Sequence, residues 1–410
     1  MADDARELAL FLLRGVLVQK IMMSDLVSVA EGPPEVLARG QRLANAVLRK
    51  LGPADAALKP FLHKAPQPAV RDLLRLATVE LLAEGEAAHG VVNDAVSLAK
   101  RASPRSAGMV NAVLRRVAEQ GQEAFDAAPP TRLPGWLRGR IGATHGNAIA
   151  AKIEAAHGAG APLDLTARGD AAALAEATGG TLLPTGSVRI TGRAQVSALP
   201  GFEAGDFWVQ DAAAALPAKL LAPAPGERVL DLCAAPGGKT MQLAAAGADV
   251  TALDLSARRM KRVEENLTRT GLSATLVTAD ALKWEPDAPF DAILLDAPCS
   301  ATGTIRRHPD LPHVRDGKSL KPLFALQAQL LARAAGWLKP GGRLLYCTCS
   351  LLPEEGEAQI EALEGLTPEA PEAEWIEDAW RSGPGLRTRP DYWPDSGGMD
   401  GFYMALLRQG

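Results

Sequence analysis

The sequence predicts an α/β protein with three parts: an all-helical N-terminal domain, a small mixed α+β segment, and a Rossmann-like α/β domain with a parallel sheet. Three observations lead to this prediction. Apolar residues repeat at helical spacing through the first part, a Pro-rich junction follows, and from about residue 206 strand-like runs alternate with helical runs. We place the domains at residues 1–125, 126–200 and 201–410.

The first part contains five amphipathic stretches separated by Gly and Pro signals such as Gly32-Pro33-Pro34. The peptide NAVLR occurs twice in it, which a duplicated two-helix unit or chance explains equally well. The second part begins with DAAPPTRLPGW and contains two strand-like runs, PLDLTARG and GSVRITG, around small helices. We therefore expect a helical bundle followed by a connecting subdomain.

The strand-like runs of the third part are RVLDL, DVTALDL, ATLVTAD, FDAILLDA, GRLLYCTC and, near the end of the chain, GFYMALL. Their alternation with helical runs is typical of a parallel sheet with helices on both faces. Ligands bind such sheets at the carboxyl ends of the strands. Polar residues at these ends are therefore the candidates for a site.

Composition indicates an ordinary globular protein, with 47% hydrophobic and 22% charged residues among 410. No apolar run approaches the ~18 residues of a spanning helix, and the N-terminal segment lacks the clean apolar run of a signal peptide. We expect a cytoplasmic protein with no membrane partner, and nothing suggests more than a monomer. Six scattered His residues and no C-x-x-C spacing argue against a metal site.

The charge distribution is uneven. The formal net charge of -4 argues weakly against nucleic-acid binding, but residues 353–380 contain ten Asp or Glu and no Lys or Arg. The bulk of the chain is therefore mildly basic. We interpret the acidic stretch as a solvated helix face and loop.

The segment VLDLCAAPGGKT is a strand, a Gly-rich turn and a helix start, which lets a backbone approach a nucleotide-like ligand closely. It is not a P-loop, because Cys233 stands where that motif needs Gly, and no G-x-G-x-x-G follows the strand. Asp254, Asp280 and Asp296 end the three following strands. A single Asp there is more often a cap, but three in order indicate ligand contacts, with ribose at Asp254 and an adenine edge at Asp280.

Cys299 and Cys349 each directly follow a predicted buried strand, so both thiols are expected at one sheet edge. Such a pair suits covalent attack on a pyrimidine. A thiolate adds to C6 of cytosine, C5 then accepts a methyl group from a sulfonium donor, and a base removes the C5 proton. Asp296 is placed to hold N3 and the exocyclic amine, and Lys239 supplies a nearby positive charge or is merely solvated. The other cysteines are Cys233 and Cys347, and all four are expected to be reduced.

The motifs VQDAAAALPAKLL, DLCAAPGGKT, DAPCSATGTIRRHPD, YCTCSLLPEEGE and DGFYMALL resemble, in this order, those of the Sun/NOL/NOP family of RNA cytosine-5 methyltransferases. ARELAL, HGVVNDAVSLAKRA and GMVNAVLRRV are similar to the NusB-like RNA-binding domain of the bacterial small-subunit rRNA member. The resemblance implies a seven-strand class I methyltransferase sheet with an antiparallel last strand, S-adenosylmethionine as donor, and a 16S rRNA cytosine as target.

Carried over by motif, the resemblance makes Cys349 the nucleophile and Cys299 the residue that assists adduct breakdown. Cys347 departs from the family pattern, which has Ser or Ala there, and it points to the same strand face as Cys349, so spacing alone leaves the attacking thiol open. The implied cofactor pocket consists of Cys233, Ala234, Ala235, Pro236, Gly237, Gly238, Lys239, Asp254, Asp280 and Asp296. Expected RNA contacts are Arg306, Arg307, His308, Arg115 and Arg116.

Two other functions are compatible with the sequence. One is a cytosine-5 methyltransferase that acts on transfer RNA, because the NusB-like character points to rRNA only by analogy. The other is a non-catalytic RNA-binding assembly factor that uses the methyltransferase domain as a scaffold, against which the intact cysteine pair argues.

Overall fold

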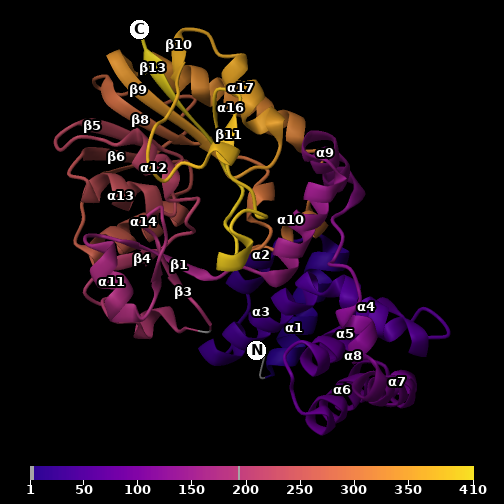
Figure 1. The fold of residues 1–410 in the computed structure, drawn as a ribbon. Helices are drawn as coiled ribbons and strands as arrows, with labels where there is room; N and C mark the ends of the chain where they lie inside the picture. The colour runs from indigo at the N-terminus through magenta and orange to yellow at the C-terminus, as the bar shows by residue number, and fades with distance from the viewer. Residues whose placement is uncertain (1–3, 193) are drawn as a thin grey trace. The chain divides into compact units, whose positions relative to one another are not determined.

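The computed structural model describes residues 4–192 and 194–410, and the chain forms two compact units (Figure 1). Unit 1 comprises the described residues through Gly160 together with 305–318. Unit 2 comprises 161–304 and 319–410. This division differs from the expected boundaries at 125 and 200, because two further helices extend the helical part to residue 159 and a short piece of the expected third domain joins it.

Unit 1 is all-helical, as predicted. Its first helix begins where the Asp4 side chain accepts a hydrogen bond from the Arg6 N–H, and several others begin at Pro, which suits a first helical turn. The helices are α1 (Ala5–Arg14), α2 (Met23–Ser28), α3 (Pro34–Arg49), α4 (Leu51–Leu58), α5 (Pro68–Leu82), α6 (Ala88–Ala102), α7 (Ala107–Gln120), α8 (Gln122–Asp126), α9 (Gly135–His145), α10 (Asn147–Ala159) and α15 (Leu311–Val314).

Residues 305–318, which include α15, are held within unit 1 by backbone and side-chain bonds. The Asp310 carboxylate accepts from the Met23 N–H at 2.8 Å, and the Arg306 carbonyl accepts from Arg49 Nη2 at 2.9 Å. Sequence patterns could not show this, because the segment directly follows the Cys299 motif along the chain.

Unit 2 begins with a small antiparallel sheet in the order β2-β3-β1-β4. Both strand-like runs of the connecting segment are confirmed as strands, β1 and β3. The elements are β1 (Leu163–Ala167), α11 (Ala171–Thr178), β2 (Thr181–Leu182), β3 (Val188–Ile190) and β4 (Phe207–Val209). A buried ion pair joins Arg189 to Asp164 at 2.7 Å across β3 and β1.

The large sheet of unit 2 has the order β11-β12-β13-β9-β8-β5-β6-β7, with β10 also paired to β13. Its elements are α12 (Leu216–Leu221), β5 (Arg228–Leu232), α13 (Gly238–Ala245), β6 (Asp249–Asp254), α14 (Ala257–Thr270), β7 (Thr275–Thr278), β8 (Phe290–Asp296), α16 (Leu320–Gly336), β9 (Leu338–Thr348), α17 (Glu357–Glu361), β10 (Leu366–Glu369), β11 (Arg381–Ser382), β12 (Gly385–Arg387) and β13 (Tyr403–Gln409).

The predicted strands and their directions are confirmed. The strands β5 to β9 pair in parallel, and β13 runs antiparallel to β9. The sequence shows six strand-like runs and the resemblance implies seven strands, whereas the sheet formed by the described residues has nine, because the short strands β10, β11 and β12 join the six beside β13.

Helices cover both faces of this sheet (Figure 1), so successive strand residues are buried on opposite sides. On β8, Ile293 packs in a cluster that contains residues of α16, whereas Leu294 packs in a cluster that contains residues of α12 and α13. The helix α14 packs Met260, Val263 and Leu267, at spacings of three and four, against the α13 side. The carboxyl ends of the parallel strands lie together at one edge of the sheet.

Truncation of Leu294 tests the buried sheet. Leu294→Ala should lower the free energy of unfolding by ~2–5 kcal/mol, because the residue is fully buried and the cavity cannot collapse. Leu276→Ala on the edge strand β7, where the side chain is 36% exposed, should cost less than half as much. Urea denaturation of both variants measures the difference. Equal losses would contradict the described burial.

Candidate active site

The loop after β5 turns through two left-handed backbone positions. Cys233 has φ of 67° and Gly237 has φ of 100°, a region that favours glycine. The N–H groups of Cys233 and Ala234 donate to the Leu253 carbonyl of β6 at 2.8 and 3.0 Å. A Cβ at Gly237 would lie 3.1 Å from Val263 Cγ1, so the loop is packed tightly on α14. It leads into the N-terminus of α13, whose first amides can meet a ligand.

Asp254 ends β6 beside this loop. Its carboxylate accepts from the Ser256 N–H at 2.9 Å and from the Ala235 N–H at 3.2 Å, and it pairs with Arg259 at 3.2 Å. The residue is therefore a buried cap and an ion-pair partner at once. Asp280, after β7, accepts from the Leu282 N–H at 3.0 Å and is more exposed.

The sequence analysis missed Asp231 on β5. Burial, together with the charges of Asp296 and Asp254, raises its pKa to about 7 against the lowering effects of a Thr240 hydrogen bond and Lys239. Its Oδ1 atom is buried without a partner in the described part of the chain. The signal in the sequence that could have identified Asp231 is a single acid within the otherwise apolar end of the run RVLDL.

Lys239 and Asp296 form an ion pair at the centre of the edge. Lys239 Nζ lies 2.7 Å from Asp296 Oδ2 and 5.3 Å from the centre of the Phe402 ring. Burial alone would lower the pKa of Lys239, but Asp296 and other neighbouring negative groups raise it above its ordinary value. Lys239 is thus buried and charged, and the alternative of a solvated lysine is wrong.

Cys299 and Cys349, fifty positions apart in sequence, are in contact. Their Sγ atoms lie 3.4 Å apart, and the Gly303 N–H donates to the Cys349 carbonyl at 3.0 Å. Both residues are half-buried. Cys347 is fully buried, and its thiol donates to Asp296 Oδ1 at 3.6 Å. The structure therefore brings three of the four thiols and the Asp296–Lys239 pair together.

Burial and nearby negative charge act on three of the four thiols. The hydrogen bond with Cys349, burial and nearby negative charge raise the pKa of Cys299 well above its ordinary value. Burial and the Asp296 charge raise the pKa of Cys347 in the same way. Burial, followed by the charges of Asp296, Asp254 and Asp231, raises the pKa of Cys233. A thiolate, the nucleophilic form, is thus disfavoured at Cys299, Cys347 and Cys233.

All five residues expected to contact RNA belong to unit 1. Arg115 and Arg116 are exposed on α7, His308 is exposed and Arg307 is half-buried. Arg306 is fully buried, which does not fit the expected surface contact with a phosphate. The burial of Arg306 cannot be read from the RRH tripeptide alone.

The interpretation of residues 353–380 as solvated was wrong for part of the stretch. Glu355 is fully buried, and the Glu357 carboxylate pairs with the buried Arg387. The sequence analysis did not identify either acid, although both lie in the quoted motif YCTCSLLPEEGE. Among the described residues, no group of three or more His, Cys, Asp or Glu could hold a metal ion, and no helix is long and apolar enough to cross a membrane.

Comparison with known proteins identifies relatives of the whole chain. A family model described as 16S rRNA methyltransferase RsmB/F matches residues 218–408, and a NusB family model matches residues 3–119. Ribosomal RNA small subunit methyltransferase B of Pseudomonas putida is 41% identical over 371 residues, covering 85% of this chain and 84% of that protein. The protein of the same name from Xanthomonas campestris pv. campestris is 37% identical over 396 residues, covering 91% and 89%.

Solved structures share the fold. A methyltransferase homolog from Pyrococcus horikoshii is 27% identical with a TM-score of 0.56, covering 66% of this chain and 94% of that chain. The structure of PH0851 covers 100% of both chains at a TM-score of 0.72 and 23% identity. The large sheet, the thiol pair and these relatives agree with the predicted family, and the chain belongs to the RsmB/F family of 16S rRNA methyltransferases.

Proposed function

We propose that this protein transfers a methyl group from S-adenosylmethionine to C5 of a cytosine in small-subunit rRNA, through a covalent bond between Cys349 and C6. The observation that carries the proposal is the contact between Cys299 and Cys349 beside the Asp296–Lys239 pair. A substrate of this kind implies action in the cytoplasm, and we expect a monomer.

The residues at the carboxyl edge of the sheet fit S-adenosylmethionine by their chemistry. Asp231, Asp254 and Asp296 all act on the pKa of Cys233, so three carboxylates surround the loop that would hold this cationic ligand. Ribose and adenine donate hydrogen bonds that Asp254 and Asp280 can accept. The segment Cys233–Lys239 supplies the close backbone approach. When bound, S-adenosylmethionine supplies the electrophilic methyl group that C5 accepts.

The two contacting thiols support a division of roles. Either sulfur can donate in the 3.4 Å contact, and we assign the donor role to Cys299, since burial and nearby negative charge disfavour its thiolate, and the attacking role to Cys349. Cys349 adds to C6, and the C5–C6 double-bond electrons activate C5. After methylation a base takes the C5 proton, the double bond re-forms, and Cys349 leaves as a thiolate that the Cys299 S–H again stabilises.

Asp296 and Lys239 are placed to act on the cytosine ring. The carboxylate suits the exocyclic amine and a protonated N3, where charge changes as the thiolate adds to C6. Lys239 holds Asp296 in place through the 2.7 Å ion pair, and the buried setting strengthens this interaction. These two residues would thereby orient the base without forming a covalent bond to it.

Methyl transfer to isolated RNA tests the function. Tritiated S-adenosylmethionine is supplied with protein-free small-subunit rRNA or bulk transfer RNA, and the modified base is identified by mass spectrometry. We expect methyl on C5 of one rRNA cytosine. Methyl transfer to transfer RNA would support the proposed chemistry but contradict the proposed substrate. A protein that does not bind S-adenosylmethionine would favour the alternative of a non-catalytic assembly factor.

Separate replacement of Cys349 and Cys347 tests which thiol attacks. Cys349→Ala should abolish methylation, because the ring then lacks its nucleophile. Cys347→Ala should largely spare it, because the Cys347 thiol is fully buried and donates to Asp296. Initial rates of methyl transfer measure both variants, with circular dichroism as the folding control. The reverse order of activities would overturn the assignment.

Charge reversal on α7 tests RNA binding by unit 1. Arg115→Glu with Arg116→Glu should weaken binding of small-subunit rRNA and reduce the slope of log K against log[salt] by about 1.4–1.8, if each exposed arginine neutralises one phosphate. Filter binding from low to physiological salt measures affinity and slope together. An unchanged slope would exclude these two arginines as phosphate contacts.

A further inference from the structure

Glu355 is a buried acid within a stretch that the sequence presents as solvated. It ends the short 3-10 helix Pro353–Glu355, between β9 and α17, and is fully buried. Removing a carboxylate from water costs several kcal/mol unless hydrogen bonds or charges replace its hydration. Such a residue therefore calls for an explanation from its contacts.

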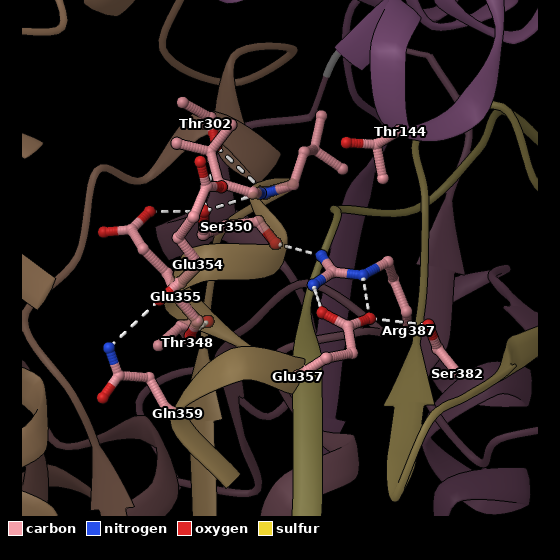
Figure 2. A network of polar contacts seen from close by, with 12 residues as sticks. Thr144, Thr302, Thr348, Ser350, Glu354, Glu355, Glu357, Gln359, Ser382 and Arg387 are labelled. Atoms are coloured by element: carbon pink, nitrogen blue, oxygen red, sulfur yellow. Dashed lines mark hydrogen bonds and ion pairs between the residues drawn. The ribbon is translucent and has the colours of Figure 1, made fainter. Parts of the chain in front are cut away.

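The Glu355 carboxylate joins the two cysteine loops. Its Oε1 accepts from the Ser300 N–H at 2.8 Å and from Gln327 Nε2 at 3.0 Å. Its Oε2 accepts from the Ser300 and Ser350 hydroxyl groups. Ser300 directly follows Cys299 and Ser350 directly follows Cys349. One carboxylate thus holds the residue next to each thiol, and Figure 2 shows it beside Ser350.

The backbone of Glu355 fixes the end of β9 as well. Its carbonyl accepts from the Tyr346 hydroxyl at 2.9 Å and from Thr348 Oγ1 at 3.0 Å. Thr348 immediately precedes Cys349. The Cys349 loop is therefore anchored on both sides of the thiol by a single residue.

Further bonds lock Ser350 and the Cys299 loop. Arg387 Nη1 donates to the Ser350 carbonyl at 2.7 Å, and Arg387 itself is paired with Glu357 (Figure 2). Gln327 on α16 donates to the Pro298 carbonyl at 2.9 Å in addition to Glu355. Ser350 is thus held at its hydroxyl and at its carbonyl, and the residue before Cys299 is tied to the same carboxylate through Gln327.

The Glu355 charge also acts on the thiol pair. Within residues 4–192 and 194–410, the donors that reach the Glu355 carboxylate are two hydroxyl groups, one side-chain amide and one backbone N–H. Neutral hydrogen-bond donors, rather than a cation, therefore balance its charge. This charge is among the causes that raise the pKa of Cys299, after the Cys349 hydrogen bond, burial and the Cys349 charge. The residue is therefore coupled to Cys299 through its charge as well as through hydrogen bonds.

We propose that Glu355 is a positioning residue that sets the contact between Cys299 and Cys349 through its hydrogen bonds to the residue after each cysteine, and that its negative charge favours Cys299 as the donor in this contact. The inference rests on the proposed function, because it assigns unequal roles to the two thiols. The observation that carries it is one buried carboxylate bonded to the residue after each cysteine.

Glu355→Gln keeps the shape of the side chain and removes its charge and one acceptor. We expect the kcat of methyl transfer to fall by ~10- to 100-fold through misplacement of the thiols, with the KM for S-adenosylmethionine changed less than about 2-fold. Glu361→Gln is the matched control, because this exposed acid on α17 carries the same charge change. It should leave both constants unchanged.

The pH profile of Cys299 alkylation separates positioning from a loss of fold. Iodoacetamide labelling of Cys299 is measured by mass spectrometry in the Cys349→Ala background, so that Cys349 does not compete for the reagent. Removal of a neighbouring negative charge stabilises the thiolate, so Glu355→Gln should shift the profile to lower pH. A merely structural role would leave its midpoint in place. Wild-type kcat together with an unshifted profile would overturn the proposal.

Ser350→Ala provides a second test of the proposal if the Glu355→Gln variant does not fold. This variant removes one donor to Glu355 and leaves the charge, so kcat should fall while the Cys299 profile stays in place. An unchanged kcat would contradict positioning through Ser350. The alkylation assay needs neither RNA nor S-adenosylmethionine, so a wild-type protein that methylates no RNA would refute the proposed function while the action of Glu355 on Cys299 is still measured.

Discussion

The register in which β8 pairs with β9 from Ala292 to Asp296 is the constraint on which the site depends. Asp296 lies opposite Cys347, and the Ala297 N–H donates to the Cys347 carbonyl at 2.9 Å. Both loops therefore leave the sheet at the same level, and Cys299 meets Cys349. A slip by one residue would turn the side chains of one strand to the opposite face. The Asp296–Lys239 pair and the thiol contact would then be lost together.

Buried charge is distributed around this edge in two ways. Asp296 is balanced by the cation of Lys239, whereas Glu355 is balanced by neutral donors from both loops. The first arrangement leaves an acid near the predicted position of the base. The second places negative charge beside Cys299, which disfavours the thiolate there. Together they place one carboxylate near the expected position of the base and a second beside the Cys299 loop.

Local sequence was sufficient for the strands and for the thiols at one edge, because parallel strands end on the same side of their sheet. Local sequence was insufficient to predict the burial of Glu355, because a run of acids has the composition of a solvated segment. The groups that donate hydrogen bonds to the Glu355 carboxylate come from residues 300, 327 and 350. Local sequence was also insufficient for Arg306, whose segment joins unit 1 through Arg49 and Met23. Contacts distant in sequence decided both cases.

Mapping of a trapped covalent complex tests the central claim most directly. Small-subunit rRNA containing 5-fluorocytidine would hold the enzyme after methyl transfer, because fluorine at C5 cannot leave as the proton does. Fragmentation of the linked peptide by tandem mass spectrometry then locates the nucleotide. The account predicts attachment to Cys349. Attachment to Cys347 or Cys299, or methyl transfer to cytosine without any trapped complex, would contradict it.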